Sequence, residues 1–236
     1  MAIAYLSFPG SFTLSCFLAF FMPAHGAVAA TFEIEPLLEK MEEAYAGVQD
    51  YQANMEIRNY KPDGSFETER FIYTFEKPKR IRLDFESPHA GMVLVYPDPN
   101  GKVHVRPGGW ARHFPFSLSP DSSFLGTPSG QRIDQTDLGL LIRNISHSLT
   151  DQRRGPVEMA EDDGQIRIRV LAEDHFRKGV VTRYQFLIDR ELWLPVQVEE
   201  SEPSGLLERR VVFGDLRINV PLPDHFFQLN GEEAGK

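Results

Sequence analysis

The residue types that most often carry catalysis or bind metals do not fall at usable spacings in this sequence. None of the histidines after residue 30 forms an H-x-x-x-H pair, which would place two imidazoles on one helix face toward a metal ion. These histidines are His89, His104, His113, His147, His175 and His225. Ser117, Ser119 and Ser146 lack the G-x-S-x-G turn that exposes a nucleophilic serine. The sequence therefore predicts no hydrolytic site and no metal site.

Two further features resemble chemical motifs but are better explained as turns. Gly108-Gly109 is followed by no helix start and no Lys-Ser/Thr, so it does not predict a phosphate-binding loop. Asp162-Asp163 precedes Gly164, which is typical of a hairpin turn. We expect no enzyme and no cofactor. A hydrolase acting on envelope lipids or glycans stays open as an alternative, because residues distant in sequence can converge in a fold.

The N-terminal residues 1–30 have the form of a secretory signal peptide. An apolar run extends from Phe12 to Phe21, no Asp, Glu, Lys or Arg precedes Glu33, and small residues end the segment. We expect cleavage near Ala29 or Ala30, a periplasmic location, and one domain over 31–236. The alternative is an uncleaved anchor, although the run is shorter than the roughly 18–20 residues that a membrane-spanning helix needs.

Cysteine usage and charge exclude several other functions. Cys16, the only cysteine, lies inside the apolar run, so the exported chain would have neither a disulfide nor a thiol site. The chain has 34 acidic and 25 basic residues, a formal net charge of −9. This balance argues against nucleic acid as a partner.

The chain begins its domain with a helix and continues with strands. Apolar residues at helical spacing follow Pro36 and end near Gly47. Apolar residues then alternate with polar ones on five strands, separated by Pro- and Gly-rich turns. The positions of that alternation are Tyr51–Ile57, Phe71–Phe75, Ile81–Phe85, Met92–Tyr96 and Val103–Val105. The pattern predicts an antiparallel meander with one apolar face.

A long connection and a second helix interrupt the strands. Residues 107–132 are rich in Gly, Pro and Ser but contain several aromatic residues, which we expect to pack on the sheet or on a ligand. Thr136 or Asp137 is a plausible N-cap for a helix that ends at Leu149. Strand patterns then resume over 166–170, 184–188, 192–198, 207–213 and 216–220. The sequence predicts a mainly β (α+β) fold of roughly ten strands. Its strongly curved antiparallel sheet would form an open half-barrel with helices lidding the concave apolar face.

Three stretches of the sequence resemble the LolA-like periplasmic outer-membrane lipoprotein carrier (lipoprotein-sorting) family. The first is Lys77-Pro78-Lys79-Arg80-Ile81-Arg82-Leu83-Asp84-Phe85 with its Gly101-Lys102-Val103 return. The second is the Leu192–Val198 hairpin with Leu194-Pro195 and Gly205. The third is Val212-Phe213-Gly214-Asp215-Leu216-Arg217-Ile218-Asn219, followed by Phe226 or Phe227. The resemblance covers nearly all of the chain after the signal peptide, and it rests on the order and spacing of the motifs.

The resemblance implies a carrier that holds the acyl chains of lipoproteins or other lipids while crossing the aqueous periplasm. A donor complex in the inner membrane or an acceptor in the outer membrane would be its partner. Proteins resembling this family also act as periplasmic sensors that bind lipid or unfolded envelope proteins and signal to a membrane partner, and this is the alternative function.

The candidate ligand-binding residues are those expected to face the concave groove or to lie on its lid. From the sheet they are Met55, Ile57, Phe71, Tyr73, Phe75, Leu83, Phe85 and Leu94. From the lid they are Trp110, Phe116, Leu141, Ile142 and Ile145. Each would also serve as ordinary core, so the prediction is collective: the interior is expected to be larger than its own side chains fill.

Overall fold

The computed structural model describes residues 33–122, 124–125 and 131–229, so the predicted signal peptide lies outside the described residues. These residues form two α-helices, two short 3-10 helices and eleven strands. The helices are α1 (Ile34–Ala46), η1 (Gly109–His113), η2 (Ile133–Gln135) and α2 (Leu138–Leu149). The strands are β1 (Asp50–Tyr60), β2 (Phe66–Glu76), β3 (Arg80–Ser87), β4 (Val93–Tyr96), β5 (Val103–Arg106), β6 (Phe116–Leu118), β7 (Glu158–Asp162), β8 (Gln165–Glu173), β9 (Val181–Asp189), β10 (Pro195–Ser201) and β11 (Leu207–Ile218).

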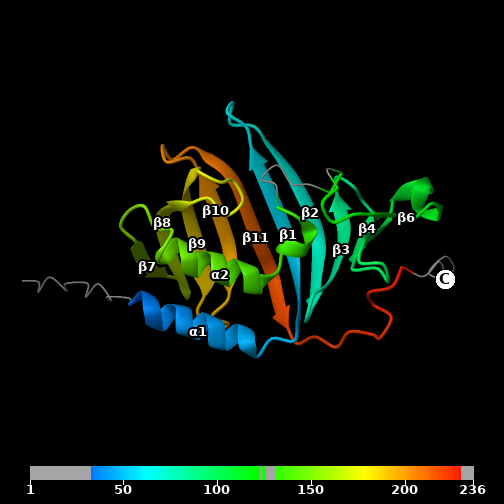
Figure 1. Ribbon diagram of the computed structural model, residues 1–236, viewed down its shortest axis with the longest axis horizontal. Coiled ribbons are helices and arrows are strands. Elements are labelled where there is room, and N and C mark those ends of the chain that lie inside the picture. The colour runs from blue at the N-terminus through cyan, green and yellow to red at the C-terminus, as the bar shows by residue number, and fades with distance from the viewer. Residues whose placement is uncertain (1–32, 123, 126–130, 230–236) are drawn as a thin grey trace, which may run out of the picture. The chain divides into compact units, whose positions relative to one another are not determined.

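All eleven strands belong to one antiparallel sheet in the order β6-β5-β4-β3-β2-β1-β11-β10-β9-β8-β7. The two halves of the chain each form a meander, and β1 joins them by pairing with β11. Figure 1 shows a curved sheet with α2 lying across β9 and β10 and α1 along one end. The sheet is not closed, since β6 and β7 remain at its two edges. The predicted mainly β half-barrel with helices on one face is confirmed.

The main core lies between the concave face of the sheet and the two helices. Alternating residues of the long strands are buried there, as in β8, where Ile166, Ile168 and Val170 are almost inaccessible to solvent. On α1 the buried residues are Leu37, Leu38 and Met41. Helix and sheet therefore stabilise each other by burying their apolar sides together.

A second, smaller core lies on the opposite face of the sheet. Val93 and Val95 of β4 point away from the concave side and contact Phe227 of the C-terminal segment. The guanidinium of Arg82 donates a hydrogen bond to the carbonyl oxygen of Phe226 over 2.7 Å. The aromatic residues that ended the third family-like stretch thus cover the outer face of the sheet.

The element boundaries differ from the predicted ones in two strand regions. Residues Leu207–Ile218 form one strand, whereas the sequence predicted two. A bulge near Gly214-Asp215 shifts the register opposite Gln52 and Asn54 of β1. It reverses which alternate residues face inward, and this change of phase was interpreted as a break between two strands. β10 begins only at Pro195, because the residues before it form a turn in which Trp193 has a φ of 53°.

The sequence prediction missed two short edge strands. β7 carries mostly exposed acidic residues, and β6 has only three residues, so neither shows the apolar alternation of a half-buried strand. The hairpin predicted at Asp162-Asp163-Gly164 is confirmed, since Asp162 pairs with Gln165 across a two-residue turn. Both turn residues have positive φ (47° at Asp163 and 73° at Gly164), the geometry of a type I′ turn.

Candidate functional site: an apolar cavity between the sheet and α2

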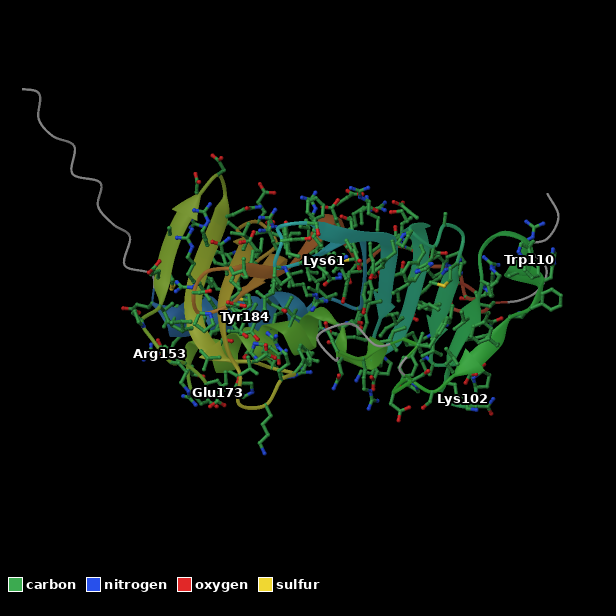
Figure 2. The ribbon with its side chains drawn as sticks, turned by 90° about the horizontal axis from the view of Figure 1, so that it is seen from above. Lys61, Lys102, Trp110, Arg153, Glu173 and Tyr184 are labelled. Carbon is green, nitrogen blue, oxygen red and sulfur yellow. The ribbon has the colours of Figure 1, made fainter. Side chains whose placement is uncertain are left out.

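A cavity of about 90 Å³ lies between the concave face of the sheet and α2. Its walls come from β1, β2, β3, β9, β10 and β11, and its cover comes from α2 and the segment that precedes it. Apolar side chains dominate the walls. Figure 2 shows Tyr184 of β9 in this part of the molecule.

The structure brings six of the predicted binding residues together around this cavity. Five of them lie on the strands and one lies on the helix, so sheet and lid both contribute. They are Met55, Ile57, Phe71, Tyr73, Leu83 and Leu141. Binding of a ligand by these side chains stays a prediction.

Five other predicted residues belong to the core without lining the cavity. Phe75 stacks on Tyr51 with ring centroids 5.2 Å apart, and Phe85 packs on Phe71 at 5.1 Å. Leu94, Ile142 and Ile145 are buried among other apolar side chains. These residues support the walls and the lid from behind.

Trp110 and Phe116 lie away from the cavity, so their placement on the lid was wrong. The connection from β5 to β6 leaves the sheet at its edge instead of folding back over the concave face. There the Trp110 side chain is 83% exposed and packs edge-to-face on Phe114, with ring centroids 6.3 Å apart. The aromatic residues of this segment therefore pack largely on one another.

The N-terminus of α2 is fixed to the sheet by polar contacts. The Asp137 carboxylate accepts a hydrogen bond from the backbone N–H of Leu140 at 2.9 Å, which confirms the predicted N-cap. The buried hydroxyl of Tyr51 accepts a second one from the N–H of Leu138 at 3.0 Å. Two N–H groups that a helix leaves unpaired at its start are thereby satisfied.

A serine and a histidine meet at the C-terminal end of α2. The Ser148 hydroxyl and Nε2 of His175 are 3.1 Å apart, and the His175 ring stacks on Tyr184 with centroids 4.8 Å apart. Burial lowers the pKa of His175 to about 4, so the imidazole is neutral at physiological pH. The adjacent carboxylate of Asp174 accepts hydrogen bonds from Arg177 and Thr182.

This pair has the composition of a hydrolytic dyad but lacks two of its requirements. Ser148 is fully buried and is not part of the cavity wall, whereas a nucleophile must reach its substrate. The Asp174 side chain contacts Arg177 and Thr182 instead of orienting the imidazole. The contact between Ser148 and His175 therefore fastens α2 to the loop between β8 and β9.

One end of the cavity is polar. Glu200 of β10 and Arg209 of β11 oppose each other there, and His175, Gln131 and Asn144 of α2 also line the cavity. The guanidinium of Arg209 donates to the side-chain oxygen of Gln131 at 3.3 Å, which connects the sheet to the segment before α2. The cavity thus presents an apolar body with a hydrogen-bonding end.

Sequence reasoning missed this polar end and the walls supplied by β9, β10 and β11. A signal was present, because Arg209 is in phase with the apolar residues Val211 and Phe213 of its strand, and Glu200 with Val198. A charged residue within an apolar alternation indicates a buried polar group.

The cavity leaves about 90 Å³ that its own side chains do not fill, whereas typical ligand pockets start near ~300 Å³. In this conformation α2 lies close to the sheet. An acyl chain would fit only if α2 or the segment before it moved outward.

In the described part of the chain, the His, Asp and Glu side chains form no group of three that could hold a metal ion. Neither α1 nor α2 is long and apolar enough to cross a membrane, and no other described helix is.

Comparison with known proteins finds likeness in structure and none in sequence. No protein-family model and no curated protein matches the chain. Among solved structures, an uncharacterized conserved protein from Thermus thermophilus matches over 85% of this chain and 95% of its own, with 9% identity and a TM-score of 0.50. At this identity the likeness concerns the fold alone.

Two other matching structures have TM-scores below 0.5. A LolA superfamily protein from Nitrosomonas europaea has 14% identity and a TM-score of 0.37, with 82% of this chain and 96% of its own covered. MucB from Pseudomonas aeruginosa, solved in complex with MucA, has 17% identity and a TM-score of 0.40, with 83% and 60% covered. The resemblance to LolA-like proteins predicted from the sequence thus recurs among solved structures, while the open half-barrel itself is shown by the single antiparallel sheet of this chain.

Proposed function

We propose that this chain binds an acyl chain of a lipid or lipoprotein between its sheet and α2 and carries it through the periplasm toward the outer membrane. The observation that carries this proposal is the apolar cavity on the concave face, bounded by a helix that contacts the sheet through few polar groups. Burial of each methylene group is favourable by about 0.8 kcal/mol, so a long acyl chain would offset part of the free-energy cost of exposing the buried face of α2.

The polar end of the cavity supports an amphiphilic ligand. An acyl chain attached to an ester or amide would bring hydrogen-bonding groups that need partners once they leave water. Arg209 and Gln131 are the hydrogen-bonding groups at that end. No metal or cofactor is part of this function.

The test is lipid extraction and native mass spectrometry of the exported protein, purified from the periplasm of its host. We expect co-purifying acyl lipids or lipopeptides, and uptake of a fluorescent fatty acid by the emptied protein. Leu141→Trp fills the cavity and should abolish both. Leu140→Trp is the matched control, because Leu140 precedes it on the same helix, is also partly exposed and does not line the cavity.

An empty protein that takes up no fatty acid would overturn the carrier proposal. Equal uptake by wild type, Leu141→Trp and Leu140→Trp would place any lipid elsewhere. If the empty protein instead retained one membrane protein during purification, the sensor alternative would replace the carrier.

A further inference from the structure

Four aromatic side chains form an exposed cluster at the β6 edge of the sheet, here called the aromatic knob. Its members are Trp110, Phe114, Phe116 and Phe124, with exposed fractions of 83%, 66%, 39% and 71%. They pack as two edge-to-face pairs, Trp110 with Phe114 and Phe116 with Phe124, each with ring centroids 6.3 Å apart. Figure 2 places Trp110 at the end of the molecule remote from Tyr184 of the cavity. Soluble proteins rarely leave such clusters in water without a partner.

The knob is held in a defined position. A Cβ on Gly108 would lie 2.2 Å from the carbonyl oxygen of Ala90, so only glycine permits the close approach of these two backbone segments. Phe116 is fixed by its pairing with Val105 across β5 and β6. The two ends of the β5–β6 connection, which carries Trp110 and Phe114, are therefore fixed relative to the sheet.

The segment that carries the knob is less acidic than the whole protein. The chain has a net charge of −9, whereas residues 98–124 contain Lys102, Arg106 and Arg112 against Asp98 and Asp121. Arg112 is exposed and lies within η1, between Trp110 and Phe114. The knob thus places an exposed arginine between two exposed aromatic rings in an acidic protein.

We propose that the aromatic knob docks the protein on a bilayer that contains anionic phospholipid. Tryptophan and phenylalanine rings partition into the boundary between headgroups and acyl chains, and nearby arginines are attracted to anionic headgroups. Four side chains at one strand end are few for a stable protein interface, which buries roughly 800 Å² on each partner. They suffice for reversible membrane attachment, in which a few inserted rings and basic residues act together.

This docking goes beyond the acyl-binding function and does not depend on it. The knob and the cavity share no residue, since Trp110, Phe114, Phe116 and Phe124 are absent from the cavity wall. Loss of docking would leave acyl binding in solution intact, and an occluded cavity would leave docking intact. The two proposals can fail separately.

Tryptophan fluorescence tests the docking at the residue concerned. The chain has two tryptophans, so a Trp193→Phe protein reports from Trp110 alone. We add vesicles of phosphatidylglycerol and phosphatidylcholine, or of phosphatidylcholine only, to the natively processed protein. We expect a blue shift of Trp110 emission and quenching by brominated acyl chains on the anionic vesicles, both weakened by high salt.

Vesicle sedimentation of variants provides the second measurement. Phe114→Ser and Trp110→Ser should each lower the partition coefficient about tenfold, as expected for withdrawing one large ring from the bilayer. Arg112→Glu should lower it about tenfold on anionic vesicles and little on neutral ones. Leu206→Ser is the matched control, because Leu206 is an exposed apolar residue on the turn between β10 and β11, outside the knob.

Several results would overturn the proposal. Trp110 emission that does not respond to anionic vesicles would do so, as would knob variants that sediment like wild type. Light scattering that shows a dimer which Phe114→Ser converts to a monomer would identify a second copy of this chain as the occupant of the knob. Thermal unfolding of each variant establishes that the fold is retained.

Discussion

Glu200 and Arg209 face each other from neighbouring strands inside the cavity, with carboxylate oxygen and guanidinium nitrogen 3.6 Å apart. Their side chains are only 13% and 9% exposed. Burial raises the pKa of Glu200, and the positive charge of Arg209 opposes that rise. Because a buried charge without its partner is costly, the cation of Arg209 compensates a carboxylate at Glu200 in this apolar setting.

Removing the cation from this pair should destabilise the protein in a pH-dependent way. Arg209→Leu leaves the Glu200 carboxylate buried without its counter-charge, and we expect a loss of about 3 kcal/mol in the free energy of unfolding near neutral pH. A carboxyl whose folded pKa is raised binds its proton more tightly when folded, so this loss should shrink as the pH falls and Glu200 is protonated. Urea unfolding at neutral pH and at about pH 5 measures both values.

The double variant Glu200→Leu, Arg209→Leu is the control for that experiment. It removes both charges and replaces them with apolar side chains, so most of the stability at neutral pH should return. A loss in Arg209→Leu that is equal at both pH values would show that packing, and not the unpaired carboxylate, is responsible.

His175 should make the fold sensitive to acid. Its pKa is lowered to about 4 by burial, whereas an unfolded histidine titrates near 6.5. Between these values the unfolded chain binds a proton that the folded protein does not, so stability is full above the unfolded pKa and falls as the pH drops through it. His175→Gln retains an amide that can contact Ser148 but does not titrate. In this variant the decrease in unfolding free energy between neutral pH and about pH 5 should be about 2 kcal/mol smaller than in wild type.

His113→Gln provides a comparison for that measurement, because His113 is exposed in η1. It makes the same chemical substitution outside the contact with Ser148. If His175→Gln and wild type lost stability in parallel between neutral pH and about pH 5, another buried group would account for the acid sensitivity.

Much of the fold was predictable because period-two alternation directly reports a half-buried strand. The alternation from Tyr51 to Val105 predicted five consecutive strands correctly, and Asp137 was one of the two residues predicted as the helix cap. The alternation could not predict β7, because its exposed acidic residues have no buried side. The bulge at Gly214 was also missed, because a change of phase in the alternation resembles the end of a strand.

The site was predictable only in part, since facing inward and lining a cavity are different properties. Met55 and Phe71 meet both conditions, whereas Phe75 faces inward and is covered by Tyr51. Which inward residues stay uncovered depends on where α2 lies, and that depends on contacts between distant residues, such as Tyr51 with Leu138. Trp110 was misplaced because its hydrophobicity predicts burial, while its connection leaves the sheet at an edge.

The close contact between α1 and α2 depends on the absence of a side chain at Gly139. A Cβ at this position would lie 2.5 Å from a ring carbon of Tyr45. Gly139→Ala should therefore displace the ring or the helix and lower the unfolding free energy by about 1–3 kcal/mol, despite alanine's higher helix propensity. Tyr45→Ala removes the ring, so it should lower the unfolding free energy less in the Gly139→Ala protein than in wild type. Equal costs in both backgrounds would show that the two residues do not interact.

The hydroxyl of Tyr51 should control how readily α2 leaves the sheet. Tyr51→Phe removes the acceptor for the Leu138 N–H at the start of the helix, and we expect a loss of about 1 kcal/mol in the free energy of unfolding. Since the cavity of about 90 Å³ must widen before an acyl chain enters, a weaker attachment of α2 should also speed uptake of a fluorescent fatty acid. Hydrogen exchange should accelerate at the amides of α2 while those of β4, which packs on the C-terminal segment, serve as the internal reference. Faster exchange along α2 without faster uptake would mean that the ligand enters by another route, and unchanged exchange would show that the Tyr51 hydroxyl does not hold the helix.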